Sequence, residues 1–383
     1  MEQVLYKLPD GWEWKRIEEV FTITSGKNLT KKDMADEGKF SVYGGNGIAG
    51  RYNDFNLSGS NIIIGRVGAL CGNVRLVNGD IWVTDNAFFI KEYKVDILKE
   101  YLAQVLSALN LGETANKAAQ PVISYKGIKD LVIPYPPLDE QKRIVEKLDA
   151  LLNRIDTAIE HLQESVTLAD ALSKNGLSEI FESLKDRYEV VPLSSVVKIN
   201  SGIALPKLFK NGFSDGDIPF FKVAQMNNHH ETMVAPEITF NETVAKEHKI
   251  KLFPKGSTLI PKRGGAILTN KKRMLLEDAS YDSNIMGLKA DESKISDEYL
   301  FAFMRTIDLA NFVDASTIPQ VNNKHIDQMQ IPLASIEEQA DVVSRVNLLV
   351  KKVETMNSEI QRQLDDLQAL KSSILDSAFK GEL

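Results

Sequence analysis

A cluster of basic residues in the second half of the chain has the composition of a nucleic-acid contact. Residues 246–273 contain nine lysines or arginines and one acidic residue, a net charge of +8. The candidate DNA-binding residues in this run are Lys262, Arg263, Asn270, Lys271, Lys272 and Arg273. Lysine and arginine bind phosphates, and asparagine beside them can read base edges. These residues could grip DNA, although a solvated charged surface has the same pattern.

The first half of the chain contains smaller clusters of the same kind. Its candidate DNA-binding residues are Lys27, Asn28, Lys31, Lys32, Arg66 and Arg75. Two polar loops marked by a proline add Lys117 and Gln120 in the first half, and Gln320, Asn322, Asn323 and Lys324 in the second. These loops could line a groove that faces DNA, or they could be turns that lead into a helix.

No motif in the chain predicts catalysis. Residues 45–50 match the G-x-G-x-x-G pattern of dinucleotide-binding proteins, but a polar, turn-rich stretch follows where that fold needs a helix. The chain has no Walker A loop, no H-E-x-x-H zinc motif and neither Asn-Pro-Pro-Tyr nor Asp-Pro-Pro-Tyr of amino-methyltransferases. Cys71 is the only cysteine, and the adjacent His229 and His230 would point to opposite sides of an extended strand. We expect no catalytic residue and no bound metal.

The distribution of charge removes an apparent objection to DNA binding. The chain has 383 residues and a net charge of −7, of which −4 lies in residues 138–187 and −3 in residues 336–383. The blocks 1–137 and 188–335 are therefore neutral, and a neutral block can still present a basic face. Because there is neither a signal peptide nor an apolar run of about 18 residues, we expect a cytoplasmic protein without a membrane span.

The chain repeats itself at an interval the size of a domain. Ile133-Pro134 followed by Leu138-Asp139-Glu140-Gln141 returns 198 residues later as Ile331-Pro332 followed by Ile336-Glu337-Glu338-Gln339. Phe181 and Phe379 keep the same offset. A repeat of this length indicates two similar halves in tandem rather than a solenoid.

The repeated segments have the pattern of long coiled-coil helices. Apolar residues alternate spacings of three and four from Val145 to Ala169, and again from Val343 to Leu367. This 3.5-residue period predicts two proline-free helices, each about 70 Å long, that pack against each other within the chain. Asn357 occupies one position of the seam, where it could set the register or lie slightly to one side.

The blocks before the two long helices predict mixed α/β globules with strands on a curved or barrel-like sheet. Short β-type runs and glycine-rich turns precede one helix near residues 97–107, and the same order returns before a helix near residues 296–306. Gly26 matches Gly202 at an offset of 176, whereas Arg66 matches Arg263 at 197. The second block has therefore gained about 21 residues around 205–250. Two different DNA readers on a common frame would have this pattern.

Four segments carry a resemblance to a known family. They are residues 8–12, residues 43–48, residues 136–141 and the C-terminal residues 373–383. In duplicate and in order, they resemble the DNA-specificity subunit of type I restriction–modification systems. The second long helix departs from the family pattern, because Ala334-Ser335-Ile336 stands where the family has Pro-Pro-Leu.

The resemblance implies an α+β fold with two tandem mixed α/β target-recognition domains, 1–137 and 188–335. Two long antiparallel coiled-coil helices, 138–187 and 336–383, would separate them with pseudo-two-fold symmetry. Each domain would read half of a split double-stranded DNA site, with the helices spacing half-sites about one helical turn (~34 Å) apart.

The resemblance also implies a non-catalytic subunit with no cofactor of its own. Its partners would be two methyltransferase subunits and restriction–translocase subunits, which would bind S-adenosylmethionine, ATP and magnesium. The rival interpretation is a coiled-coil assembly scaffold that does not read DNA. The basic run at 246–273 favours the specificity subunit.

Overall fold

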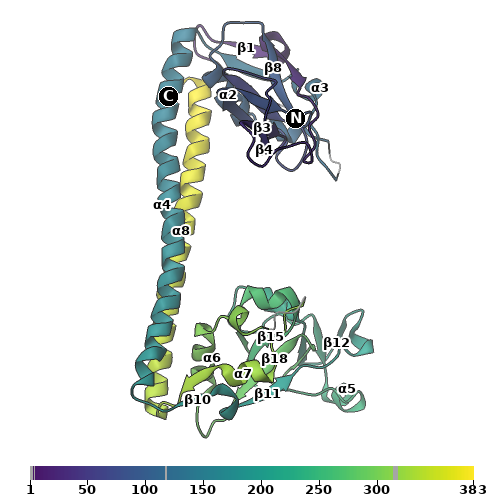
Figure 1. The fold of residues 1–383 in the computed structure, drawn as a ribbon, viewed down its shortest axis with the longest axis vertical. Helices are drawn as coiled ribbons and strands as arrows, with labels where there is room; N and C mark the ends of the chain where they lie inside the picture. The colour runs from purple at the N-terminus through teal and green to yellow at the C-terminus, as the bar shows by residue number, and fades with distance from the viewer. Residues whose placement is uncertain (1–2, 4, 117–118, 314–317) are drawn as a thin grey trace. The chain divides into compact units, whose positions relative to one another are not determined.

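The computed structural model describes residues 3, 5–116, 119–313 and 318–383. They form two compact units, Met1–Gln163 with Gln361–Leu383, and Glu164–Ile360. Each unit contains one globular α/β domain and part of two long helices, α4 (Leu138–Lys185) and α8 (Ile336–Lys380) (Figure 1). The expected α+β fold with two mixed domains and two long packed helices is confirmed.

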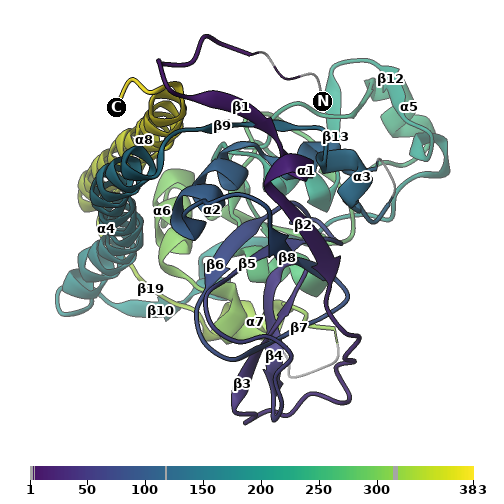
Figure 2. The same cartoon turned by 90° about the horizontal axis from the view of Figure 1, so that it is seen from above.

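The described residues of the first domain form three small sheets (Figure 2). One pairs β1 (Glu13–Arg16) with β9 (Val132–Tyr135), and another has the order β2 (Phe21–Ser25), β8 (Ala87–Tyr93), β5 (Asn61–Gly65), β6 (Val74–Val77). The third has the order β4 (Gly47–Tyr52), β3 (Phe40–Gly44), β7 (Ile81–Val83). Its α-helices are α1 (Ile17–Val20), α2 (Lys99–Ala108) and α3 (Tyr125–Ile128).

The second domain repeats this plan. β10 (Val190–Pro192) pairs with β19 (Gln330–Pro332), and a four-stranded sheet has the order β11 (Val197–Ser201), β18 (Ile285–Ala290), β15 (Thr258–Pro261), β16 (Arg273–Met274). The other sheet has the order β12 (Phe213–Asp215), β14 (Ile238–Phe240), β13 (Ile218–Phe221), β17 (Ser280–Tyr281). Its α-helices are α5 (Glu242–Glu247), α6 (Asp297–Thr306) and α7 (Asn323–Gln328). β12 and α5 belong to the region of extra residues predicted from the sequence.

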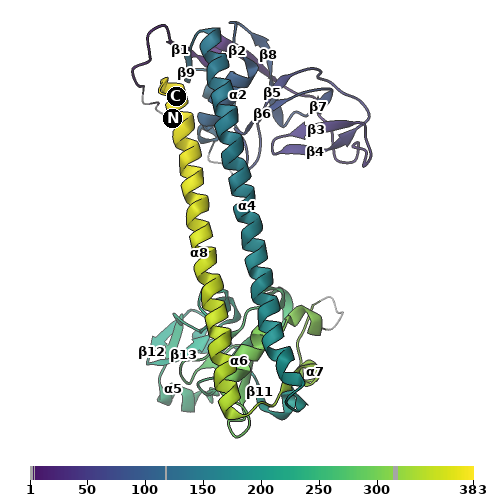
Figure 3. The ribbon, with the colours of Figure 1, turned by 90° about the vertical axis from the view of Figure 1, so that its left-hand side faces the viewer.

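The long helices run antiparallel in each unit (Figure 3). In the first unit, Arg143 Nη1 donates to the Leu383 carbonyl at 2.8 Å, and Lys371 pairs with Asp156 at 2.6 Å. In the second unit, the Asn357 amide donates to Asp170 at 3.1 Å, and Arg187 pairs with Glu338 at 2.9 Å. In both units the residue numbers along α4 rise while those of their partners along α8 fall, as antiparallel packing requires.

The predicted apolar seam between the helices is buried or half-buried along its length. Its buried members include Leu148, Ile155, Ala169, Val346, Val353, Ile360 and Leu364. Asn357 is half-buried, and its Oδ1 atom has no hydrogen-bond partner. Asn357 therefore lies at the seam, where its amide group reaches across to α4.

Duplicated glutamines attach the start of each long helix to the domain that precedes it. Gln141 Oε1 accepts the Leu98 N–H at 2.9 Å, and Gln339 Oε1 accepts the Ser296 N–H at 2.8 Å. Each glutamine is completely or almost completely buried, with exposed fractions of 0% and 1%. Because Leu98 and Ser296 are the N-caps of α2 and α6, each glutamine satisfies a backbone N–H that precedes a domain helix.

Duplicated aromatic contacts attach the C-terminal end of α4 to the second domain and the C-terminal end of α8 to the first domain. Phe379, near the end of α8, packs against Tyr101 of the first domain with ring centroids 6.0 Å apart. Phe181, near the end of α4, packs against Tyr299 of the second domain at 5.5 Å. The hydroxyl groups of these tyrosines donate to the carbonyls of Pro134 and Pro332. Each unit therefore contains the start of one long helix and the end of the other.

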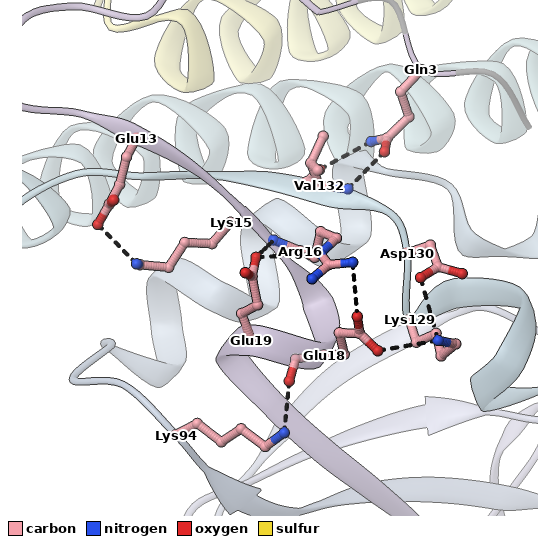
Figure 4. A network of polar contacts seen from close by, with 10 residues as sticks. All are labelled: Gln3, Glu13, Lys15, Arg16, Glu18, Glu19, Lys94, Lys129, Asp130 and Val132. Atoms are coloured by element: carbon pink, nitrogen blue, oxygen red, sulfur yellow. Dashed lines mark hydrogen bonds and ion pairs between the residues drawn. The ribbon is translucent and has the colours of Figure 1, made fainter.

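Charged side chains join α1 to β1 and to the residues that follow β8 and α3 in the first domain (Figure 4). The Glu18 carboxylate forms ion pairs with Arg16 and Lys129, each at 3.1 Å. The Glu18 backbone carbonyl accepts a hydrogen bond from Lys94 Nζ at 2.7 Å. The Gln3 amide both donates to and accepts from the Val132 backbone. Val132 lies in β9, where it pairs with Arg16 of β1.

The glycine-rich segment at 45–50 is the turn and second strand of the β3–β4 hairpin. No helix follows it, so the geometry that dinucleotide binding requires is not present there. Among the described residues, no group of histidine, cysteine or acidic side chains is arranged to hold a metal ion. None of the helices in the described part of the chain is long and apolar enough to cross a membrane.

Candidate nucleic-acid interface

The backbone around Arg66 in the first domain is repeated around Lys262 in the second. The Arg66 N–H donates to the Asn86 carbonyl at 2.9 Å, and the Lys262 N–H donates to the Asn284 carbonyl at 2.7 Å. The carbonyls of Arg66 and Lys262 accept from Ile123 and Val321, each at 3.0 Å. We call residues 66–68 and 262–264 the basic turns. The structural equivalent of Arg66 is Lys262 and not Arg263, so the sequence match was wrong by one residue.

The corrected match locates the extra residues of the second domain. Forty positions separate Gly26 from Arg66, and sixty separate Gly202 from Lys262. The second domain therefore has 20 additional residues before its basic turn, close to the predicted 21.

Gly26 and Gly202 bring the chain into contact with the same loop in each domain. A Cβ atom on Gly26 would lie 2.0 Å from the Val83 carbonyl oxygen, and one on Gly202 would lie 1.9 Å from that of Asp282. No side chain fits at such distances, so glycine is required at both positions. The Lys27 N–H donates to the Val83 carbonyl at 3.0 Å, which places Lys27 beside this contact.

The structure brings several predicted residues together at the basic turns. Arg66 is half-buried, with Nη1 donating to the Asp85 carbonyl at 3.2 Å, and Lys262 Nζ donates to Ser201 Oγ at 3.0 Å. Arg263 is exposed, and its backbone forms a β-bridge with Gln320. In the first domain the Gly68 N–H donates to the Pro121 carbonyl at 3.0 Å, beside the exposed Gln120.

The remaining predicted residues of the first domain lie around this frame. Lys27, Asn28, Lys31 and Lys32 are exposed. Arg75 is half-buried and points Nη2 toward the Asn46 carbonyl at 3.4 Å. Lys117 lies outside the described residues.

Two cations of the strongest sequence cluster are buried. Lys272 and Arg273 have exposed fractions of 7% and 6%. Lys272 Nζ donates to Asn270 Oδ1 at 2.8 Å and to the Ile307 carbonyl, and burial lowers the pKa of its ammonium group to about 7. Both side chains are shielded from solvent and held by internal partners. We therefore leave Lys272 and Arg273 out of the DNA contacts proposed below, and their contact with DNA stays a prediction.

Asn270 and Asn322 have structural partners of their own. Asn270 Oδ1 also accepts the Leu309 N–H at 2.9 Å, while Lys271 beside it is half-buried. Asn322 is the N-cap of α7, with Oδ1 accepting the Lys324 N–H at 2.9 Å. The loop at 318–322 thus includes a helix-approach turn, and Asn323 and Lys324 remain exposed at the start of α7.

Asn86 and Asn284 are candidates that sequence reasoning missed. They occupy equivalent positions at the offset of 198, and the basic turn donates to the carbonyl of each. The Asn86 side chain is exposed and that of Asn284 is half-buried. Their identity at this offset was the available signal.

Comparisons with known proteins agree with the duplicated architecture. The family described as "Type I restriction modification DNA specificity domain" matches residues 9–168 and again residues 185–365. The StySPI specificity subunit of Salmonella potsdam is 22% identical, covering 98% of this chain and 90% of its own. The EcoprrI specificity subunit of Escherichia coli is 26% identical over 47% of this chain and 45% of its own.

Two solved structures share the fold. A chain from a study of complex assembly and conformational transition in a type I restriction–modification system gives a TM-score of 0.77 at 21% identity, covering 99% of this chain and 100% of that one. The HsdS subunit of Thermoanaerobacter tengcongensis gives 0.56 at 20% identity, with 99% of each chain covered.

Proposed function

This chain belongs to the type I restriction–modification DNA specificity family and is a non-catalytic DNA specificity subunit, and we propose that its two domains bind the two halves of a split site. The observation that carries the proposal is the repeated basic turn. The same backbone frame presents Arg66 in the first domain and Lys262 in the second. A frame used twice suits the sugar-phosphate backbone, because that part of DNA is the same in every half-site.

The proposed contacts are the cations and amides that the structure leaves accessible. They are Lys27, Asn28, Lys31, Lys32, Arg66, Arg75, Asn86 and Gln120 in the first domain, and Lys262, Arg263, Lys271, Gln320, Asn323 and Lys324 in the second. We expect Arg66, Lys262 and Arg263 to contact phosphates, since they lie on the repeated turn. The amides beside them are suited to base edges.

The partners follow from the same duplication. We propose that two methyltransferase subunits dock on this chain, because each unit offers an equivalent helix start and helix end. Catalysis, S-adenosylmethionine, ATP and magnesium would then belong to the methyltransferase and restriction–translocase subunits. The long helices would hold the half-sites at a set spacing along the DNA.

A footprint of the chain with its methyltransferase partners tests the proposal. We expect two protected half-sites separated by an unprotected spacer. The double variant Lys262→Ala and Arg263→Ala should weaken binding and lower the slope of log affinity against log salt by about 1 for each phosphate that the variant no longer binds.

The control is Lys246→Ala, which removes an exposed cation from α5 in the same basic run. It should leave the salt slope unchanged. One continuous footprint would contradict the split site, and an unchanged slope for the double variant would exclude the basic turn as a phosphate contact.

A further inference from the structure

One connection differs greatly between the two domains although both its ends lie on the shared frame. In the first domain β3 ends at Gly44 and β4 begins at Gly47, whereas β13 ends at Phe221 and β14 begins at Ile238. The preceding strands are held alike, because the Thr84 N–H donates to the Tyr43 carbonyl and the Asp282 N–H to that of Phe221, each at 2.9 Å. A turn of two residues has therefore become a connection of sixteen, residues 222–237.

The long connection begins beside the basic turn of the second domain. The Val223 N–H donates to Asp282 Oδ2 at 3.0 Å, and the Asn284 N–H donates to Asp282 Oδ1 at 2.8 Å. Asn284 in turn accepts the Lys262 N–H. One carboxylate thus joins the start of the connection to the residue that supports Lys262.

The middle of the connection is fastened to the core. Met226 and Met233 have exposed fractions of 1% and 3%, and both belong to an apolar cluster with Phe221 and Phe253. The Met233 N–H donates to the Met274 carbonyl at 3.0 Å, and the Met274 N–H donates to the Glu231 carbonyl at 2.9 Å. The segment between the two methionines is therefore held at both ends.

Two shielded arginines form hydrogen bonds with that segment. Arg273 Nη2 donates to the Asn228 carbonyl at 2.8 Å, and Arg305 Nε donates to Glu231 Oε1 at 2.8 Å. Arg305 also forms a second contact with Glu231 and donates to Asn347 of α8 at 3.0 Å. Arg273 is buried away from the surface, and its guanidinium group hydrogen-bonds to this segment instead.

The tip, residues 227–230, presents polar side chains to solvent. Asn227, His229 and His230 are exposed, while the Asn228 amide donates to the carbonyls of Gln225 and Thr232. Amide and imidazole groups both donate and accept hydrogen bonds, as base edges require. Ordering an exposed loop costs conformational entropy, and fixed geometry of this kind is needed where side chains must meet a defined ligand.

We propose that the tip reads base edges in the half-site bound by the second domain, with Asn227, His229 and His230 as the reading residues. Arg273 and Arg305 are positioning residues that hold the tip. The inference rests on the proposed function, since it assigns the specificity of the second domain to one segment. A surface cover without contact to DNA is the opposing interpretation.

The test uses the full chain with its methyltransferase partners. The triple variant Asn227→Ala, His229→Ala and His230→Ala is compared with wild type by sequencing the methylated sites and by competition binding. We expect roughly tenfold or greater loss of discrimination at one or more base pairs of the second half-site. The first half-site should be read as before.

The control variant is Lys210→Ala with Asn211→Ala, two exposed residues elsewhere in the second domain. It should leave both half-sites unchanged. An unchanged recognition sequence in the triple variant would overturn the inference. So would a uniform loss of affinity at all sequences, since that outcome indicates phosphate contacts without base reading.

Arg305→Ala tests the positioning role. We expect it to relax the same base pairs as the triple variant, and Arg305→Lys to restore part of the discrimination. A lower melting temperature with an unchanged recognition sequence would show a structural role only and would contradict positioning.

Exchange of residues 188–335 for those of a relative separates this inference from the proposed function. If the exchange does not change the second half-site, the proposed function fails. If the exchange changes it and the tip substitutions do not, only the inference fails.

Discussion

The two globular domains keep the same backbone contacts where the long helices attach, yet they differ in the side chains that surround those contacts. Gln141 and Gln339 make two equivalent hydrogen bonds, each accepting the N–H of a helix N-cap and donating to the carbonyl five residues before it. Elsewhere in the domains, the Glu18–Lys129 ion pair of the first domain is replaced at the equivalent place by a hydrogen bond from Ser194 to Asp327. The position of an element is thus retained while the polar side chains around it change.

The difference follows from the energies involved. An ion pair that solvent still reaches contributes about 0–1 kcal/mol, so it can be exchanged for another polar contact at small cost. A buried amide that loses its partner costs about 1–3 kcal/mol. The buried glutamine contacts therefore persist in both copies, whereas a more accessible contact such as the Glu18–Lys129 pair is free to change.

The largest expected effect concerns the aromatic attachments of the helix ends. Phe181→Ala and Phe379→Ala should each lower the free energy of unfolding of their own unit by about 3–5 kcal/mol, because a buried ring is replaced by a cavity. Phe181 also contacts Phe303 at 5.5 Å, so we expect the greater loss there. Hydrogen exchange measured separately for the two units checks the result, and a loss confined to the same unit in both variants would contradict it.

The buried glutamines should come next. Gln141→Ala and Gln339→Ala each remove a buried side chain that accepts one backbone N–H; Gln141 also donates to the Pro136 carbonyl, and Gln339 donates to the carbonyls of Lys294 and Ala334. We expect a loss of about 1–3 kcal/mol in each case. Denaturant unfolding measures it, with the exposed Gln368→Ala as the control. Unequal losses, with one near zero, would show that the two attachments are not energetically equivalent.

A third effect, confined to the second domain, depends on pH. Burial lowers the pKa of Lys272 from its ordinary 10.5 to about 7, an effect that Asp308 opposes and Lys174 reinforces. Between these two pKa values the unfolded state binds more protons, so this residue makes the free energy of unfolding rise with pH, by at most about 1.4 kcal/mol per unit.

Lys272→Met should lose this part of the pH dependence between about pH 7 and 10. Urea unfolding at several pH values compares it with wild type and with Lys255→Met, which changes an exposed lysine. If wild type and Lys272→Met kept parallel pH profiles, Lys272 would not be the titrating group.

The smallest effect concerns the seam of the long helices. Asn357 occupies the position that Ile159 occupies in α4, and its Oδ1 atom is buried without a partner. Asn357→Ile should raise the free energy of unfolding by about 1 kcal/mol through added apolar burial. Thermal unfolding measures it, and a clear destabilisation would show that the contact with Asp170 outweighs the apolar gain.

The order of elements in each half could be read from the sequence because its signals are local. The 3.5-residue period predicted α4 and α8, and the helices near residues 97–107 and 296–306 are α2 and α6. The predicted domain boundaries at 137 and 335 remain predictions, since the compact units divide both long helices between them. The one-residue error at Arg263 arose because backbone hydrogen bonds, which define equivalence, are not visible in residue identity.

For the candidate DNA contacts too, some properties follow from the sequence and others only from the tertiary structure. By itself the sequence determined the repeat, the paired helices, the location of the basic clusters and the resemblance to specificity subunits, since all of these are patterns of residue type and spacing. Only the tertiary structure decided which cations reach the surface. Lys272 and Arg273 are buried because the end of α6 and the segment around Asn228, both distant in sequence, supply their hydrogen-bond acceptors.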